Sequence, residues 1–479
     1  MKTKAFILLL LTTSLMLMVV ALYNGFGLTE NDTGAYIEKG ILNIIPNDRS
    51  PFYGWFIRYT SMWSSLWYAL FAQCLLLGYV LLKFINQLTV FSFQSAVAHS
   101  KAEGPGNNPN SDGVILSGAE EPNSSEARFT LFTIIVIVSF TCVSWVASYL
   151  MPDVFAGILL LGILLFLSYR EKKRLQLVIY ALIIFVSIIV HNSHFLIVAP
   201  FSLALFVWAV IKKHKTILKR SIVLLCLSVM SWLLMCTVNA VNGYNFTYSR
   251  GSHVFMMGKF VEMGLLNAYL DENCGKKNLK ICNYKDHMPD YSWDFIWDGE
   301  SPLYKTGGWD SNKVEYNTII HDVFTTPRYM KLFARNSATA TLRQLSQVQV
   351  PERTSPMGKW SSPWQRIGTY FGDELNEFCT CKQYGDGLSG TGSNYIYYLF
   401  FILSSCWILF HYRVLSKEIL FIYSCLFLFL LLNAFVAATF STVLSRYQNR
   451  VFWLLPATNA IIIIQFYWHR FQRTENTER

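Results

Sequence analysis

Residues 154–174, VFAGILLLGILLFLSYREKKR, join a wholly apolar run to a short basic loop. The apolar part is hydrophobic on every side, which suits a helix surrounded by lipid or by other apolar helices. The same alternation of an apolar run with a polar loop recurs along most of the 479-residue chain. It predicts an all-α polytopic membrane protein.

The composition of the chain favours the same class. Hydrophobic residues make up 53% of the sequence and charged residues only 15%, whereas soluble domains contain about 25% charged residues. The formal net charge of +10 is explained by basic cytoplasmic loops, which membrane proteins commonly have. We therefore expect membrane lipids as partners and do not expect nucleic acid; the oligomeric state stays open.

Apolar runs and the basic residues between them predict a topology of about ten transmembrane helices. Lys and Arg fill the loops at 169–174, 212–220 and 411–418, whereas MPD (151–153) and HNSH (191–194) contain neither. Because cytoplasmic loops are enriched in Lys and Arg, both termini are predicted to be cytoplasmic. The predicted spans are 5–23, 62–82, 129–150, 154–169, 175–190, 195–211, 221–241, 395–410, 419–440 and 451–468.

This topology divides the chain into five parts. Residues 85–128 are rich in Gly, Asn, Ser and Pro and are predicted to be a disordered cytoplasmic linker. Residues 242–392 form a large extracytosolic domain between the seventh and eighth helices. The other parts are 1–84, with the first two helices and the outer loop 24–61, then 129–241 with helices three to seven, and 393–479 with helices eight to ten and the tail.

Four of the ten cysteines lie in the large outer segment: Cys274, Cys282, Cys379 and Cys381. In an oxidising compartment, four cysteines suggest two disulfides, with three possible connectivities. A zinc site is the alternative, but the spacing lacks a CxxC pair. We expect disulfides.

Acidic residues stand on the predicted outer side of the membrane. Asp32 lies in TENDTGAYIEKG (29–40), directly after the first apolar run, and Asp153 lies in the turn between the third and fourth spans. A carboxylate beside a bilayer is costly to desolvate, so it usually lies in a polar cavity, at a partner or in solvated loop. Each aspartate can also serve as a helix cap. Glu30 and Glu38 are interpreted as solvated.

Basic residues and histidines gather on the same side. Arg446 and Arg450 lie in a predicted outer turn, against the positive-inside rule, and share a face if that turn is helical. Arginine offers a planar fork that suits phosphate oxygens, although snorkelling to lipid headgroups is the alternative. His191 and His194 lie between the fifth and sixth spans, where packing is the alternative to a functional role.

The pattern resembles the GT-C superfamily of integral-membrane glycosyltransferases. The residues that carry the resemblance are NDTGAYIEKG with Asp32 in the first outer loop, MPDVFAG with Asp153, and RYQNRVFWLLP near the last helices. No DxD or WWDxG-type signature is present, nor is a Walker loop, HExxH motif or GxSxG motif.

The resemblance implies transfer of a sugar from a polyprenyl-phosphate or polyprenyl-diphosphate carrier to a glycan, lipid or protein acceptor on the extracytosolic face, with inversion. Asp32 would be the base, and Asp153 would orient the acceptor or help to hold a divalent cation such as Mg²⁺ or Mn²⁺. The lipid phosphate would be bound or its charge stabilised by Arg49, Arg58, His191, His194, Arg446 and Arg450.

Other functions stay open at the level of sequence. A transporter or flippase for lipid-linked sugars is the main alternative, although the spans contain few charged residues and no internal repeat. An acyl- or phosphoethanolamine-type transferase would need a nucleophile or a metal cluster, and an assembly factor would work through its outer segment. A bacterial inner membrane, with the site facing the periplasm, is the expected location, although NDT and NFT sequons are also compatible with the endoplasmic reticulum.

Overall fold

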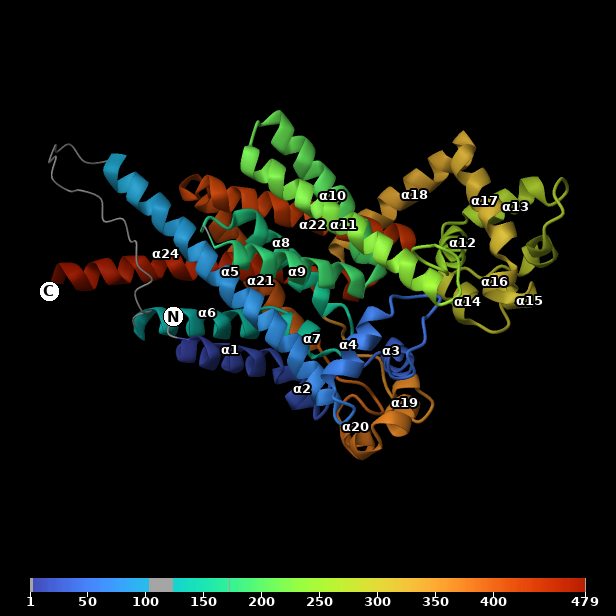
Figure 1. Cartoon of the computed structure of the whole chain (residues 1–479), viewed down its shortest axis with the longest axis horizontal. Helices are drawn as coiled ribbons and strands as arrows, with labels where there is room; N and C mark the ends of the chain where they lie inside the picture. Colours follow the sequence, from blue (N-terminus) through green and yellow to red (C-terminus); the bar gives the residue numbers. More distant parts are fainter. Residues whose placement is uncertain (1–2, 103–123, 172, 479) are drawn as a thin grey trace.

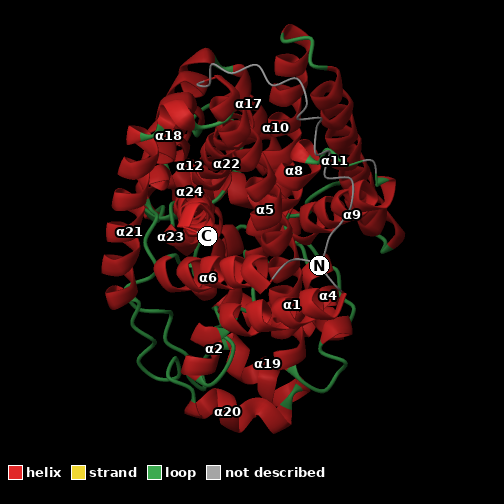
Figure 2. Cartoon of the chain, turned by 90° about the vertical axis from the view of Figure 1, so that its left-hand side faces the viewer, coloured by secondary structure: helices red, strands yellow, loops and turns green. Residues whose placement is uncertain are grey.

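The computed structural model describes residues 3–102, 124–171 and 173–478. In this part of the chain, helices form the fold, and the only β pairings are isolated bridges such as Leu28 with Tyr149. Figure 2 shows helices and connecting loops throughout. The predicted all-α class is confirmed.

Six helices of the described residues are long and apolar enough to cross a membrane, the last of them formed by α23 and α24 together. The predicted count of ten is not confirmed, because the helices at four of the predicted spans, Thr3–Leu17, Ser124–Phe140, Val154–Ser168 and Arg174–Val190, are only 15 to 17 residues long. The helices of the bundle are α1 (Thr3–Leu17), α2 (Val19–Asn24), α5 (Leu66–Ala102), α6 (Ser124–Phe140), α7 (Val143–Ser148), α8 (Val154–Ser168), α9 (Arg174–Val190), α10 (Asn192–Ile211), α11 (Lys215–Val241), α21 (Thr391–Phe410), η3 (Tyr412–Val414), α22 (Lys417–Phe440), α23 (Ser445–Phe452) and α24 (Leu454–Glu478).

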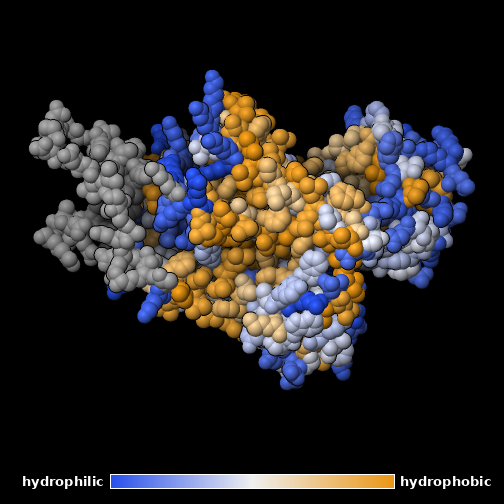
Figure 3. Space-filling model, viewed as in Figure 1, coloured by the Kyte–Doolittle hydropathy of each residue, from blue (hydrophilic) through white to orange (hydrophobic). Residues whose placement is uncertain are grey.

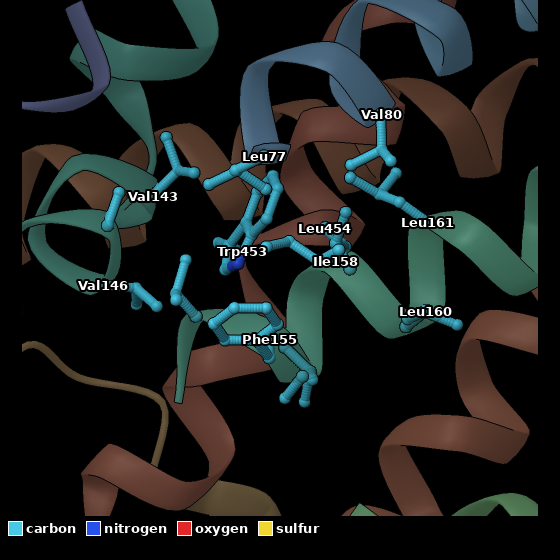
Figure 4. Close-up of a cluster of buried hydrophobic side chains, with 14 of the residues drawn as sticks. Leu77, Val80, Val143, Val146, Phe155, Ile158, Leu160, Leu161, Trp453 and Leu454 are labelled. Atoms are coloured by element: carbon cyan, nitrogen blue, oxygen red, sulfur yellow. The ribbon is translucent and has the colours of Figure 1, made fainter. Parts of the chain in front are cut away.

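α8 shows why an apolar run need not face lipid. At 15 residues it is about 22 Å long, shorter than the hydrocarbon core of a bilayer. Its side chains from Val154 to Leu167 are all buried, so its apolar character on every side matches a position inside the bundle. Trp453 packs among Leu77, Val143 and Phe155 in the same core (Figure 4).

The predicted linker 85–128 is partly helical. α5 continues without interruption to Ala102, and α6 already begins at Ser124. Residues 85–102, for which disorder was predicted, thus continue α5 in the structure, and the role of 85–128 as a cytoplasmic linker stays a prediction. Residues 103–123 lie outside the described residues.

Two separate parts form the predicted outer segment 242–392. The first has its own hydrophobic core, which includes Phe260, Tyr269 and Phe295. Its helices are α12 (Ser252–Glu262), α13 (Leu265–Asn273), η1 (Lys280–His287), α14 (Ser292–Trp297), α15 (Pro302–Lys305), α16 (Gly308–Ser311), α17 (Lys313–Thr325) and α18 (Pro327–Ser346).

The second part of this segment belongs to the core of the bundle. Val350, Ile367 and Phe378 are buried together with the membrane helices. Its helices are α19 (Ser362–Tyr370), η2 (Gly372–Glu374) and α20 (Leu375–Thr380). α19 packs against α3 (Asn31–Ile41) of the first outer loop, and α3 in turn packs against α4 (Phe52–Thr60) (Figure 1).

Only one of the two expected disulfides is present in the structure. Cys274 and Cys282 are bonded, with their Cα atoms 5.5 Å apart. Cys379 and Cys381 are both free thiols. Cys379 lies in the last turn of α20, whereas Cys381 follows the helix in extended conformation and is buried. The expectation of a second disulfide is corrected accordingly.

On the face that Figure 3 shows, an apolar band covers the middle of the molecule. In Figure 3 hydrophobic residues cover the bundle, and hydrophilic residues lie at both ends. The start of α1 and the end of α24 lie at the same end, opposite α12 to α17 (Figure 1). This distribution is the one expected for a membrane protein with a large polar part on one side.

Candidate functional site

α3 carries Asp32 to the centre of the candidate site. The backbone N–H of Glu30 donates to the hydroxyl of Thr33 over 3.0 Å and so closes the first turn. The residue before Glu30, Thr29, is bonded by the side-chain amide of Gln383. The amide oxygen accepts the N–H of Thr29 over 3.0 Å, and the amide nitrogen donates to the carbonyl of Thr29 over 2.8 Å. Glu30 is the N-cap residue of α3, so Asp32 does not cap the helix. The side chain of Asp32 instead contacts Arg49 and Arg446.

Two arginines hold the carboxylate of Asp32. Arg49 Nη2 lies 3.1 Å from one oxygen and Arg446 Nη2 lies 3.5 Å from the other. Arg49 also bonds Asp48 over 2.5 Å. Burial opposes ionisation of Asp32, but the two guanidinium groups outweigh it and lower the pKa of this carboxyl below its ordinary value. Asp32 is therefore ionised at neutral pH.

Asp153 forms the second acidic position of the cluster. It precedes α8, but its side chain makes no capping bond. Arg450 Nη1 lies 3.2 Å from one of its oxygens, and Arg446 Nε lies 3.9 Å from the other. Arg446 of α23 thus lies between Asp32 of α3 and Asp153, which precedes α8. These three elements are far apart in the sequence.

The buried Arg450 is fully engaged by neighbouring side chains. It is 1% exposed and donates to Asn433 Oδ1 over 2.9 and 3.2 Å and to Ser193 Oγ over 3.2 Å. A charge buried this deeply needs such partners. Asn433 and Ser193 were not predicted, because neutral polar residues in or beside apolar runs produce no distinctive pattern.

The two histidines have different positions. His191 lines the cavities described below, and its Nδ1 accepts the N–H of Ser193 over 3.2 Å. Burial, reinforced by the nearby arginines, lowers its pKa well below the usual range, so the ring is neutral at neutral pH. His194 is fully buried behind it, with Nδ1 2.6 Å from the carbonyl of Ser187.

These residues surround a charged cavity of about 170 Å³. Five of the predicted site residues line it: Asp32, Arg49, Asp153, His191 and Arg446. α14 contributes Trp293 and Trp297, which are 55% and 38% exposed. The remaining lining residues are Tyr36, Asp48, Met151, Phe255, Ser292, Ile296, Ser441, Thr442, Leu444 and Tyr447.

An apolar cavity of about 340 Å³ adjoins the charged one. The two share the lining residues Asp48, His191, Phe255, Ser441 and Tyr447. The ends of α10, α12 and α22 contribute the apolar residues Leu196, Met256, Val436, Ala437 and Phe440. The remaining lining residues are polar: Asn192, Ser193, Tyr248, Ser249, Ser252 and Arg450. The pair of cavities can therefore accept a molecule with one charged and one apolar end.

Glu30 is a partly buried residue that the sequence interpretation assigned to solvent. It accepts a hydrogen bond from Ser355 over 2.8 Å and lines a small cavity of about 30 Å³ with Asp153, Arg446 and Arg450. Burial raises the pKa of this carboxyl, although Arg446 opposes the shift. Glu30 thus adds a third carboxyl group around Arg446.

Two other predicted charges lie outside the cavities. Arg58 donates to the carbonyls of Gly40 (3.3 Å) and Ile41 (2.9 Å) at the end of α3, and its guanidinium lies over the ring of Trp63. It stabilises a helix C-terminus and does not reach the cluster. Glu38 forms an ion pair with Arg366 of α19 over 3.0 Å.

The arrangement does not fit the divalent cation that was considered for Asp32 and Asp153. The guanidinium of Arg446 takes the position between the two carboxylates that a bridging cation would need. In the described part of the chain, no group of three or more His, Cys, Asp and Glu residues has the geometry to hold a metal ion.

Comparison with protein-family models, with curated proteins and with solved structures finds no match to this chain. The functional interpretation therefore depends on the geometry of the charged and apolar cavities.

Proposed function

We propose that the protein is a membrane glycosyltransferase that moves a sugar from a polyprenyl-phosphate or polyprenyl-diphosphate carrier to an acceptor hydroxyl in the charged cavity. The observation that carries the proposal is the ionised carboxylate of Asp32, held by Arg49 and Arg446 in a cavity that adjoins an apolar one. An amphiphilic donor needs both environments.

Arg446 is the best candidate for the group that binds the donor phosphate. Its contacts with Asp32 and Asp153 are long, at 3.5 and 3.9 Å, and its Nε has no hydrogen-bond acceptor within the described residues. It can therefore turn towards a phosphate at little cost, whereas Arg450 is held by Asn433 and Asp153. Arg450 is accordingly a positioning residue that fixes Asp153.

Movement of Arg446 would also activate the base. Asp32 loses one of its two cationic partners when Arg446 turns to the phosphate, so its affinity for a proton rises. Asp32 then takes the proton of the acceptor hydroxyl while the acceptor oxygen bonds to the anomeric carbon. The bond from that carbon to the phosphate oxygen breaks, and polyprenyl phosphate or diphosphate leaves with inversion at the sugar.

The walls of the cavities match the other parts of the two substrates. Leu196, Val436 and Phe440 offer apolar surface for the first isoprene units. Trp293 and Trp297 offer large, partly exposed ring faces at the edge of the charged cavity. Aromatic side chains of this kind suit a ring that has both apolar and polar edges, as a pyranose has.

The test compares Asp32→Asn with Glu38→Gln in purified protein. Both substitutions neutralise a carboxylate of α3, but Glu38 pairs with Arg366 outside the cavities. With a panel of polyprenyl-phosphate sugars and envelope acceptors, we expect Asp32→Asn to slow release of the polyprenyl carrier by about 10²–10⁴-fold. Glu38→Gln should stay within about threefold of the unaltered protein.

The same assay separates the alternative functions. If the unaltered protein binds carrier lipid without turnover and moves it across vesicle membranes, the transporter is the better interpretation. Equal turnover by Asp32→Asn and the unaltered protein would contradict the role of Asp32.

A further inference from the structure

A separate cavity lies at the other end of the bundle. α8 begins next to Asp153 and runs for 15 residues, or about 22 Å, away from the charged cavity. Near its far end lies a cavity of about 430 Å³ that shares no lining residue with the charged or apolar cavity. It is lined by Phe166, Leu177, Val178, Ala181, Lys215, Thr216, Lys219, Arg220 and Val223.

The floor of this cavity is apolar and open to the surroundings of the bundle. Phe166 of α8, Ala181 of α9 and Val223 of α11 contribute to it. Val178 is 53% exposed and Val223 is 39% exposed. Apolar side chains left exposed on a membrane-spanning bundle can be covered by hydrocarbon chains of lipid.

The rim of the cavity is cationic. Lys215 and Lys219 are four residues apart at the start of α11, so they lie on one face. Neither has an ion pair within the described residues, and no Asp or Glu lines the cavity. The nearby Glu171 lies 3.4 Å from Lys173, and Glu418 lies 2.7 Å from Arg170.

The start of α11 adds neutral donors to this rim. The ring of His214 accepts the N–H of Ile217 over 3.3 Å, and the carbonyl of His214 accepts that of Leu218. The N–H groups of Lys215 and Thr216 precede these bonds and are therefore available to an anion. Arg220 has another role, because it donates to the carbonyls of Leu167 (2.5 Å) and Tyr169 at the end of α8.

We propose that this cavity binds one anionic phospholipid. Its phosphate would lie between Lys215, Lys219 and the hydroxyl of Thr216, and an acyl chain would cover Val178 and Ala181. A zwitterionic lipid suits the site less well, because its own cation would be repelled by the lysines. Arg220 is a positioning residue that joins the start of α11 to the end of α8.

Native mass spectrometry of the full chain in detergent tests the proposal. Phosphatidylglycerol and phosphatidylcholine would be titrated separately, with glycerol 3-phosphate as the headgroup without chains. We expect phosphatidylglycerol to be retained at least about tenfold more strongly than either of the other two ligands. The double variant Lys215→Gln/Lys219→Gln should lose this preference.

Two further variants separate the cavity from general surface charge. Lys212→Gln/Lys213→Gln removes the same charge from the exposed turn just before α11 but changes no lining residue, so it should keep the preference. Ala181→Trp fills the floor without changing charge and should weaken retention of the lipid. Equal retention of the two lipids, equal loss in both lysine variants, or binding of glycerol 3-phosphate as strong as that of the lipid would each overturn the proposal.

Discussion

At the scale of single residues, the ionisation of Asp32 depends on its cationic neighbours. Arg49 and Arg446 lower its pKa against the opposing effect of burial. Arg49→Gln removes one of these cations, so the pKa of Asp32 rises and the base is lost at a higher pH. For the proposed transfer reaction, we expect the acid limb of the kcat/KM profile to move to higher pH, because this limb would report the proposed base, Asp32, before substrate binds.

Arg58→Gln provides the matched control for this profile. Arg58 also lies next to α3, but it bonds the carbonyls of Gly40 and Ile41 and does not line the cavities. Its loss should lower thermal stability while the acid limb stays in place. An unmoved acid limb in Arg49→Gln would show that Asp32 is not the titrating base.

The sequence could identify site residues only where a charge interrupts an apolar pattern. Asp32, Asp153 and Arg446 stand out for this reason, and the structure brings them together. Asn433 has no such signal, although it holds Arg450 at 2.9 Å. Arg58 has the same signal as Arg446 but bonds a helix end, because a charge in a loop does not reveal which groups lie opposite it.

At the scale of elements, the crossing of α3 and α4 has no space for a side chain at Gly40. A Cβ built there would lie 2.1 Å from the carbonyl oxygen of Gly54. Gly40→Ala therefore has to separate the two helices, and we expect a loss of about 1–3 kcal/mol in stability. Since α3 carries Asp32, transfer activity should fall as well. Thermal unfolding in detergent and the transfer assay measure the two effects.

Gly299→Ala is the control for this prediction. A Cβ at Gly299 meets nothing within 4 Å, so stability and activity should both stay close to those of the unaltered protein. Unchanged unfolding of Gly40→Ala would contradict the close crossing of α3 and α4.

Helix breaks explain why the predicted spans are longer than some of the observed elements. The sequence predicts one span over 129–150, but α6 ends at Phe140 and α7 begins at Val143. The hydroxyl of Thr141 donates to the carbonyl of Ile137 over 2.7 Å and accepts the N–H of Val143 over 3.3 Å. Local bonding of this kind competes with the helix, and hydrophobicity alone does not predict it.

At the scale of the whole molecule, contacts distant in sequence assemble the site. Gln383 bonds Thr29 across 354 positions of the chain, and Arg450 bonds Asp153 across 297. The class of the fold follows from local apolar runs, whereas the first pairing depends on how the second half of the outer segment folds back onto the start of α3 and the second on how α23 packs against α8. Hydrophobic periodicity and composition do not predict such long-range contacts.

The position of the apolar cavity between two membrane-spanning helices leads to the last prediction. Leu196 of α10 lines this cavity and is 36% exposed, so Leu196→Trp should fill space that the isoprene chain of the donor would use. We expect KM for a long-chain donor to rise by about tenfold, which corresponds to about 1.4 kcal/mol of lost binding. A donor with only two isoprene units should be affected much less.

Leu203→Trp is the control, because it lies two turns further along the same face of α10, is 54% exposed and does not line the cavity. It should leave KM for both donors unchanged if the isoprene chain enters only at the end of α10 near His191. An equal rise in KM for long and short donors in Leu196→Trp would show that the substitution disturbs the charged cavity. The comparison of the two chain lengths therefore tests directly whether the apolar cavity receives the lipid part of the donor.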